Sequence, residues 1–250
     1  MTTLEAAKIT PLDEIYKNAF NLIIGGQGQG KTYHAEEIIA KNRHHFPVIK
    51  RFSPVGTSSI QETDGDLTAL LQFCAERIAE CERRKRDANA ARILLRAIRE
   101  GRPELLSDHG ISATRLEELM KRYGGIDEIG NIEPVLVFID DMGGDKTLKE
   151  STLFNQVARQ LRHLHMTVVF NAHRFKDLPP LVRDNTQTVF LHGGLSQNDL
   201  KQLWDERGFP GARRRDDLFR KYDELTAVPF GYLAIDYFAK KKKSDAESAG

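Results

Sequence analysis

A glycine-rich segment followed by lysine and threonine constrains the fold of this chain more than any other feature. Residues 25–32 read GGQGQGKT and match the pattern GxxxxGK[ST] in full. An apolar run at 20–24 (FNLII) precedes them, and residues 32–42 have the pattern of a helix. A strand before the motif and a helix after it are the context in which this pattern forms a phosphate-binding loop, or P-loop.

The residue types in this loop predict that it binds ATP. Glycines let the backbone turn tightly, so that successive N–H groups point at phosphate oxygens, and the helix N-terminus adds a favourable dipole. Lys31 should reach the β- and γ-phosphates, and the Thr32 hydroxyl should ligate Mg²⁺. The predicted nucleotide-binding residues are Gly25, Gly26, Gln27, Gly28, Gln29, Gly30, Lys31, Thr32 and Tyr33.

Two adjacent acids close the clearest buried strand in the sequence. Residues 135–139 (VLVFI) are all apolar and lead directly into Asp140 and Asp141. In P-loop enzymes an acid at this place holds the metal ion, so we assign Asp140 to Mg²⁺ together with Thr32. Asp141 is placed to orient or deprotonate the attacking water. The alternative, a helix cap or a solvated turn, is disfavoured by the apolar strand and the upstream P-loop.

Strands alternate with helices along most of the chain, which predicts an α/β fold with a mostly parallel central sheet. Further strands are expected at 47–52, 167–171, 188–192 and 232–238, and helices at 151–163 and 196–207. If strand 167–171 inserts between the P-loop strand and the acid strand, the fold is that of P-loop NTPases with an additional catalytic strand, the RecA/FtsK–HerA-like type. Asn171 or His173, at its tip, would then sense the γ-phosphate.

A charged, helical region runs from about residue 66 to 123. Apolar residues keep helical spacing from 67 to 78, a second helix is expected at 89–100, and a third at 112–123. We interpret this region as a helical insertion into a single P-loop ATPase domain, residues 1–239. The basic, polar tail at 240–250 is expected to be disordered.

Basic residues gather in the insertion, although the formal net charge of the whole chain is only +1. From residue 83 to 99 seven basic residues stand against one acid. Four of them share a helical face and would follow DNA phosphates without reading the base sequence: Lys85, Arg92, Arg96 and Arg99. A solvated helix face is an equally open interpretation. Few aromatic residues interleave, so stacking on single strands is not indicated.

The block NQVARQLRHLHMTVVFNAHRFKDLPPLVRDN, residues 155–185, resembles the viral genome-packaging ATPases of the FtsK–HerA superfamily, which include poxvirus-like and double jelly-roll virus packaging enzymes. The matching elements are Lys31-Thr32, Asp140-Asp141, Arg162-His163, residues 171–173 and the LP…R.N loop at 178–185. The resemblance covers about residues 20–192. Many relatives carry Glu at Asp141 and Gln at His173, which leaves the sensor open between His173 and Asn171.

The resemblance implies an ATP- and Mg²⁺-dependent motor that moves double-stranded DNA into a preformed capsid. It also implies a ring-shaped homo-oligomer, usually a hexamer, in which an arginine of one subunit reaches the nucleotide of its neighbour. The candidates are Arg159, Arg162 and Arg183, each of which can equally be an arginine paired with a carboxylate. Capsid or portal-vertex proteins would be further partners.

Two other functions stay open at this point. A cellular or plasmid DNA translocase or helicase-loader ATPase would share the nucleotide chemistry but not the capsid partner, and a small-molecule kinase would use the helical region as a lid. The first twenty residues lack the apolar core of a signal peptide, and no run of about 18 apolar residues occurs. We therefore expect a soluble protein that has no membrane span and is not secreted, and the resemblance implies a location in the virion or the host cytoplasm.

Overall fold

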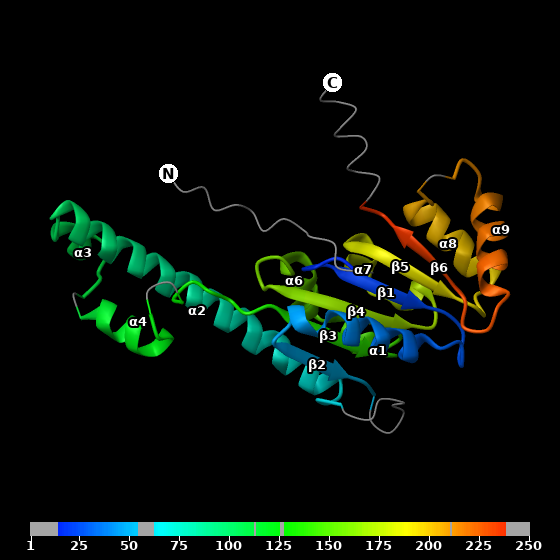
Figure 1. Cartoon of the computed structure of the whole chain (residues 1–250), viewed down its shortest axis with the longest axis horizontal. Coiled ribbons are helices and arrows are strands. Elements are labelled where there is room, and N and C mark those ends of the chain that lie inside the picture. Colours follow the sequence, from blue (N-terminus) through cyan, green and yellow to red (C-terminus); the bar gives the residue numbers. More distant parts are fainter. Residues whose placement is uncertain (1–14, 55–62, 113, 126–127, 211, 239–250) are drawn as a thin grey trace. The chain divides into compact units, whose positions relative to one another are not determined.

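A six-stranded sheet with the strand order β2-β3-β4-β1-β5-β6 organises the structure, a computed structural model that describes residues 15–54, 63–112, 114–125, 128–210 and 212–238 (Figure 1). The strands are β1 (Phe20–Ile24), β2 (Val48–Phe52), β3 (Val135–Asp140), β4 (Met166–Ala172), β5 (Thr186–His192) and β6 (Tyr232–Asp236). Strands β1 to β5 are parallel, and β6 pairs antiparallel with β5 at the edge. The α/β fold with a mostly parallel sheet is therefore confirmed.

Strand β4 lies between β1 and β3, although it follows both in the sequence. In this register Asn171 pairs with Ile23 of β1 on one side and with Asp140 of β3 on the other. Parallel strands end at the same edge of a sheet, so the P-loop, the two acids and the tip of β4 meet there. This order is the one expected of a P-loop NTPase with an additional catalytic strand.

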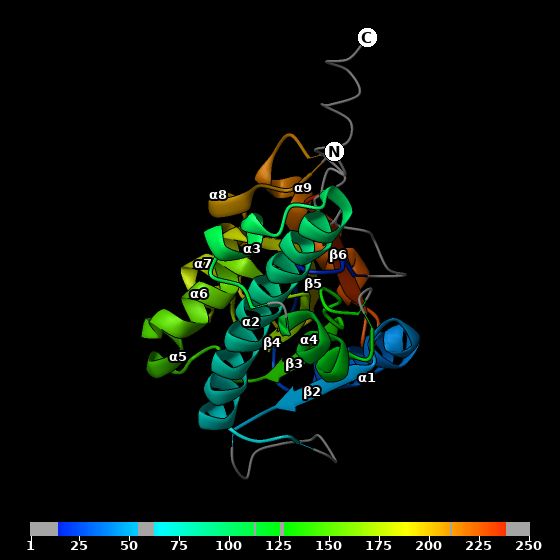
Figure 2. The same cartoon turned by 90° about the vertical axis from the view of Figure 1, so that its left-hand side faces the viewer.

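Helices cover both faces of the sheet, as Figure 2 shows for α1 (Lys31–Asn42) on one face and α5 (Lys146–Glu150) and α6 (Thr152–Gln160) on the other. Side chains that alternate along the strands build the two cores. Ile23 and Phe138 pack with Ile38 of α1. Phe20 faces the opposite way, with its ring centroid 6.3 Å from that of Phe154 on α6. Both faces are therefore buried, as in other parallel sheets.

Further helices and helical turns connect the strands or follow them. A 3₁₀ turn, η2 (Phe175–Asp177), and α7 (Pro180–Asp184) lie between β4 and β5, and another, η1 (Arg43–His45), follows α1. Helix α8 (Gln197–Arg207) confirms the helix predicted at 196–207, and its N-cap, Ser196, forms a reciprocal capping box with Asp199. Helix α9 (Arg215–Thr226) was not predicted. Its sequence is dominated by charge and buries only two side chains, so its apolar pattern is weak.

The chain divides into two compact units, one made of residues 75–133 and the other containing the sheet. Helix α2 (Leu67–Glu100) is one continuous helix, so the prediction of two separate helices here was wrong. Residues 79–88 lack apolar spacing, yet they contain no glycine or proline that would break the helix. Helices α3 (Glu104–Asp108) and α4 (Arg115–Tyr123) follow, and Ala91, Leu119 and Ile129 form a small core.

Two sequence predictions fall partly or wholly outside the described residues. The segment at 53–65 is rich in Ser, Thr, Gly and Pro, which predicts a loop, and it is described only at its ends; the tail at 240–250 is not described. Over the part of the chain that is described, none of the helices combines the length and the apolar character needed to cross a bilayer.

Candidate functional site

The loop between β1 and α1 is held in place by the end of β5. The backbone N–H of Gly26 donates to the carbonyl of Gly193 at 2.8 Å. A Cβ atom on Gly25 would lie 2.6 Å from Cβ of His192, so only glycine fits at that position. Gly28 and Gly30 have φ angles of 73° and 81°, which glycine adopts without strain. The sequence therefore folds locally into a tight loop at the N-terminus of a helix, the geometry that receives phosphate.

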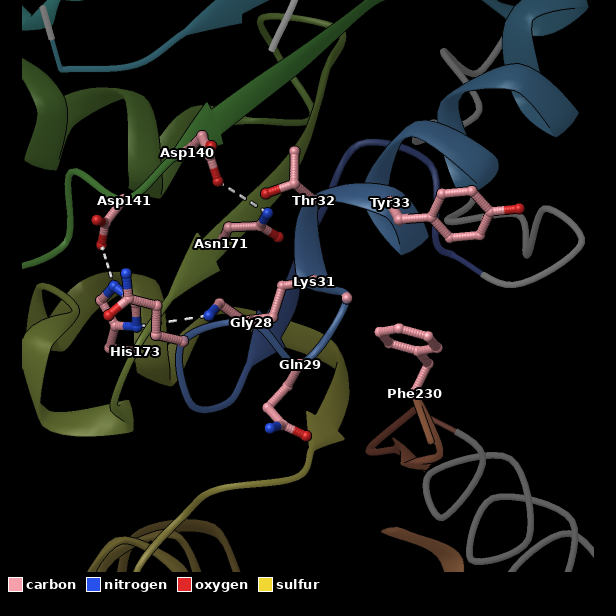
Figure 3. Close-up of a pocket in the computed structure, with 12 residues that line it drawn as sticks. Gly28, Gln29, Lys31, Thr32, Tyr33, Asp140, Asp141, Asn171, His173 and Phe230 are labelled. Atoms are coloured by element: carbon pink, nitrogen blue, oxygen red, sulfur yellow. Dashed lines mark hydrogen bonds and ion pairs between the residues drawn. The ribbon is translucent and has the colours of Figure 1, made fainter. Parts of the chain in front are cut away.

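A cavity of about 500 Å³ opens at the carboxyl edge of the sheet, directly above this loop (Figure 3). It brings together the loop residues from 27 to 33, both acids and both candidate sensors. Its lining residues are Gln27, Gly28, Gln29, Gly30, Lys31, Thr32, Tyr33, Asp140, Asp141, Asn171, His173 and Phe230. Phe230 is the one member that sequence reasoning missed, because it follows α9, far from every motif.

The side chain of Lys31 lies between the loop backbone and the acids. Its Nζ donates to the carbonyl oxygens of Gly25 and Gly26 at 2.9 and 2.8 Å and lies 3.4 Å from Nδ1 of His173. Burial lowers the pKa of Lys31, while the nearby carboxylates of Asp141 and Asp140 act in the opposite direction. This ammonium group is placed to meet the phosphates of a nucleotide that binds the loop.

Asp140 is a buried carboxylate whose orientation is set by Asn171. Asn171 Nδ2 donates to Asp140 Oδ1 at 2.9 Å. Burial raises the pKa of Asp140, and the hydrogen bond from Asn171 opposes that rise. The Oδ1 atom of Asn171 is also buried and has no hydrogen-bond partner among the described residues. A buried carboxylate beside an unpaired amide oxygen is a site that a cation would complete.

The oxygen atoms at this place suit Mg²⁺ in type and number. Among the described residues no group of three or more His, Cys, Asp or Glu side chains is arranged to hold a metal ion. Mg²⁺ needs no such cage, since it commonly binds through one or two protein oxygens together with water and substrate phosphates. Asp140 and the Thr32 hydroxyl, which line the same cavity, would supply those protein oxygens.

Asp141 and His173 form a second polar pair in the cavity. His173 Nε2 lies 3.1 Å from Oδ1 of Asp141. Because the ammonium of Lys31 can only donate, Nδ1 of His173 accepts there, and its Nε2–H donates to the carboxylate. Asp141 has a φ of 53°, a left-handed conformation that is uncommon outside glycine and that occurs preferentially at functional sites. His173 therefore links the P-loop lysine to the second acid.

The three candidate arginines lie away from this cavity. Arg159 and Arg162, both exposed, line a separate cavity of about 310 Å³ with Asn18 and Gln187 at the amino ends of the strands, the opposite edge of the sheet. Arg183 donates to Glu206 at 2.9 Å and lies over the ring of Phe175, and its side chain is only 15% exposed. The structure therefore does not bring any of the three to the phosphate loop of the same chain.

The four basic residues proposed for DNA contacts all lie on α2, with their side chains exposed. Lys85, Arg92, Arg96 and Arg99 are the ones named in the sequence, and Arg96 pairs with Glu100 at 2.9 Å. Their neighbours Arg83 and Arg84 instead bind Glu80 and lie near the ring of Tyr123. The four basic side chains proposed for DNA contacts therefore lie on the exposed surface of this helix, and one of them, Arg96, is paired with an acid.

Two buried histidines, His34 and His192, contact each other, and His192 also contacts the P-loop backbone. The sequence analysis did not predict this pair. His192 Nδ1 donates to the carbonyl of Gln29 at 2.9 Å, and its Nε2 lies 2.9 Å from Nδ1 of His34. The ring of Tyr232 on β6 stacks on both histidines. Burial and, to a smaller extent, the nearby His34 lower the pKa of His192 to about 4. The two histidines are 158 residues apart, so no local pattern indicates their contact.

Comparisons with known proteins agree with this fold. No family model matches the chain. Uncharacterized protein 075L of Invertebrate iridescent virus 6 is 24% identical over 100 residues, a match that covers 40% of this chain and 37% of the viral protein. The chain therefore matches little more than a third of that relative's length.

Among solved structures, the genome packaging NTPase B204 from Sulfolobus turreted icosahedral virus 2, in complex with AMPPCP, matches with a TM-score of 0.50 and 14% identity. The match covers 89% of this chain and 94% of that one. ATPases 2 and 3 of EssC from Geobacillus thermodenitrificans match with a TM-score of 0.48 and 15% identity over 78% of this chain and 35% of that one. The similarity to B204 shows that the two chains share a fold.

Proposed function

We propose that this protein is an Mg²⁺-dependent ATPase whose hydrolysis of ATP drives double-stranded DNA, and that its task is to package a viral genome into a preformed capsid. The position of Asn171 carries the proposal. It lies between the P-loop strand and the acid strand and donates a hydrogen bond to Asp140 at 2.9 Å, so the loop, the acid proposed as metal ligand and the candidate sensor line one cavity. This is the arrangement that hydrolysis of a nucleotide phosphate requires.

Different residues of the cavity are proposed to bind the phosphates, hold the metal ion and activate water. Lys31 and the loop amides bind and orient the β- and γ-phosphates, and Thr32 and Asp140 hold the metal ion, which supplies charge stabilisation at the phosphates when it is bound. Asp141 orients the attacking water and accepts its proton. His173, bonded to Asp141 and close to Lys31, couples the position of that acid to the occupancy of the loop.

Three observations support a DNA motor over other uses of the same chemistry. Residues 155–185 resemble the FtsK–HerA packaging ATPases, the fold matches a protein described as a genome packaging NTPase, and exposed basic residues lie along α2. Arg162 lies at the edge of the sheet opposite the P-loop, so a contact with nucleotide would have to be with that of another copy. We therefore include a ring of identical subunits in the proposal, with capsid or portal proteins as partners.

The decisive experiment measures ATP turnover of the purified chain with and without duplex DNA, with the mass of the assembly determined in parallel. Turnover should require Mg²⁺ and should rise when duplex DNA is added. Lys31→Ala should abolish turnover because it removes the charge on the β- and γ-phosphates, whereas Lys41→Ala, at the other end of α1, should retain it. Phosphate transfer to a small acceptor without a response to DNA would contradict the proposal and identify a kinase.

The contribution of α2 is tested in the same assay. Neutralising Arg92, Arg96 and Arg99 together should leave turnover without DNA unchanged, raise the DNA concentration needed for stimulation and flatten the salt dependence of DNA binding. Neutralising Lys146 and Lys149 on α5 is the matched control. An unchanged DNA response after the α2 substitutions would remove α2 from the DNA-binding surface.

A further inference from the structure

Two large exposed aromatic side chains flank the cavity on the side away from the acids. Tyr33 follows Thr32 on the first turn of α1 and is 77% exposed, and Phe230 precedes β6 and is 65% exposed. Figure 3 shows both rings on the same side of the P-loop, with Lys31 between them and the Asp141–His173 pair. The cavity therefore has a polar end, made by the acids and Lys31, and an aromatic end.

The backbone holds Phe230 in this exposed position at an energetic cost. Its φ is 60°, a left-handed conformation that is a genuine outlier for a bulky residue. The turn that contains it closes with a hydrogen bond from Gly231 N to Val228 O at 3.0 Å. A Cβ atom on Gly231 would lie 2.2 Å from the carbonyl oxygen of Leu225, so this turn requires glycine there. Such strain persists where the surrounding structure imposes it, and it concentrates at ligand sites.

The ring of Phe230 is directed at the P-loop and not at solvent alone. A Cβ atom on Gly30 would lie 2.7 Å from Cδ1 of Phe230, so the ring rests against the first residue before α1. Helix α9, which leads into the turn, is fastened to the same place, since Tyr222 donates from its hydroxyl to the carbonyl of His192 at 2.8 Å. The ring is therefore positioned relative to the phosphate loop by two independent contacts.

We propose that Phe230 and Tyr33 form the subsite for the base of a nucleoside triphosphate, with Phe230 stacking on the face of the base. The inference rests on the proposed nucleotide function and adds to it a binding group for the part of the ligand that the P-loop does not touch. A planar base has a π-face that an aromatic ring can stack on whatever its edge carries. With phosphates at Lys31 and Thr32, the rest of the nucleotide extends from the loop toward the aromatic end of the cavity.

The test compares a ligand that has a base with one that lacks it. Dissociation constants are measured for a non-hydrolysable ATP analogue and for inorganic tripolyphosphate, each with Mg²⁺. Phe230→Ala should weaken binding of the analogue about tenfold, because stacking on an aromatic ring is lost, and should leave tripolyphosphate binding unchanged. Tyr33→Ala should act in the same direction. Val228→Ala, an exposed residue of the same turn outside the cavity lining, is the control and should change neither constant.

A second variant gives a readout that depends on stacking itself. Phe230→Trp should retain affinity for the analogue, and its fluorescence should be quenched by the analogue but not by tripolyphosphate. The wild type, with Trp204 as its one tryptophan, provides the background signal. Equal weakening of both ligands by Phe230→Ala, or no weakening of either, would overturn the base subsite while leaving the phosphate site intact. A wild-type chain that binds neither ligand would refute the proposed function itself.

Discussion

Asn171 at the end of β4 donates a hydrogen bond to Asp140 at the end of β3, with 2.9 Å between Nδ2 and Oδ1. The two residues also face each other in the register of the parallel strands, so the bond is fixed by the sheet and not by a mobile loop. One carboxylate oxygen of the proposed metal ligand is thereby engaged, and the other is left to meet the cation or its water shell. A residue that sequence reasoning offers as a phosphate sensor thus also positions the metal ligand.

Removing this bond should weaken the metal site more than the fold. Asn171→Ala is expected to raise the Mg²⁺ concentration for half-maximal ATP turnover by about 10- to 100-fold, the usual effect of losing a residue that orients a metal ligand. The measurement is turnover as a function of Mg²⁺ at saturating ATP. Asn155→Ala on α6, outside the cavity, serves as the control. An unchanged Mg²⁺ requirement would limit Asn171 to another role.

Asp141 should matter for the chemical step and little for binding. Asp141→Asn keeps the size of the side chain but removes the base, so kcat is expected to fall by about 10²- to 10⁴-fold while the affinity for a non-hydrolysable ATP analogue stays the same. Asp205→Asn, an exposed acid on α8, provides a matched charge change. Turnover equal to the wild type in Asp141→Asn would show that another group activates water.

Mixing experiments can assign the arginine that acts between subunits. Arg162 is exposed at the amino edge of the sheet, whereas Arg183 is bound to Glu206. We therefore expect Arg162→Ala to be inactive alone and to regain turnover when mixed with Lys31→Ala, because a mixed interface can combine an intact loop with an intact arginine. Arg159→Ala, one turn away on α6, and Arg183→Ala are tested in the same way. Rescue of Arg183→Ala but not of Arg162→Ala would reverse the assignment.

We expect the protein to lose stability in mild acid, because His192 is buried with a lowered pKa. Burial depresses the pKa of His192 from 6.5 to about 4, so between these values the unfolded chain binds a proton that the folded chain does not. The free energy of unfolding should therefore fall as the pH falls from 6.5 toward 4, by up to about 3 kcal/mol. Denaturant unfolding at several pH values measures this.

Two variants isolate the contribution of that side chain. His192→Gln removes the titrating group and should flatten the pH dependence in this window. His44→Gln, an exposed histidine after α1, should not change it. The lowered pKa values of Asp87 and Glu80 reflect contacts that stabilise the folded chain at neutral pH. That stabilisation is lost at more acidic pH, where those carboxylates take up protons. A pH profile that is identical in the wild type and His192→Gln would contradict the argument.

The phosphate loop and the acid strand could be predicted because each depends on local sequence. A run such as VLVFI followed by two acids combines an apolar strand with charged residues at its tip, and the P-loop pattern defines its own strand and helix. The β1, β3, β4 and β5 predictions were confirmed for this reason. The insertion of β4 between two earlier strands was only a conditional expectation, and the strand order shows that the condition is met.

Other features depend on contacts between distant segments, and no local pattern encodes those. Phe230 reaches the P-loop from about 200 residues away, and its exposure and φ are properties of the folded turn. The pairing of His34 with His192 is equally non-local. The division of α2 into two helices failed for a different reason: a charged stretch without an apolar stripe still continues as a helix when nothing breaks it.

Strand β6 has a consequence for where the folding unit ends. The family resemblance stops near residue 192, at the end of β5, yet β6 pairs with β5 along its whole length and stacks Tyr232 on the two histidines. A fragment cut after β5 would contain every recognisable motif and would expose a bare row of backbone donors and acceptors beside an unfilled apolar face. Such an edge recruits other strands, so the fragment would be prone to aggregate. The segment that the motifs delimit, which ends with β5, is therefore shorter than the segment needed to cover the edge of the sheet, which includes β6.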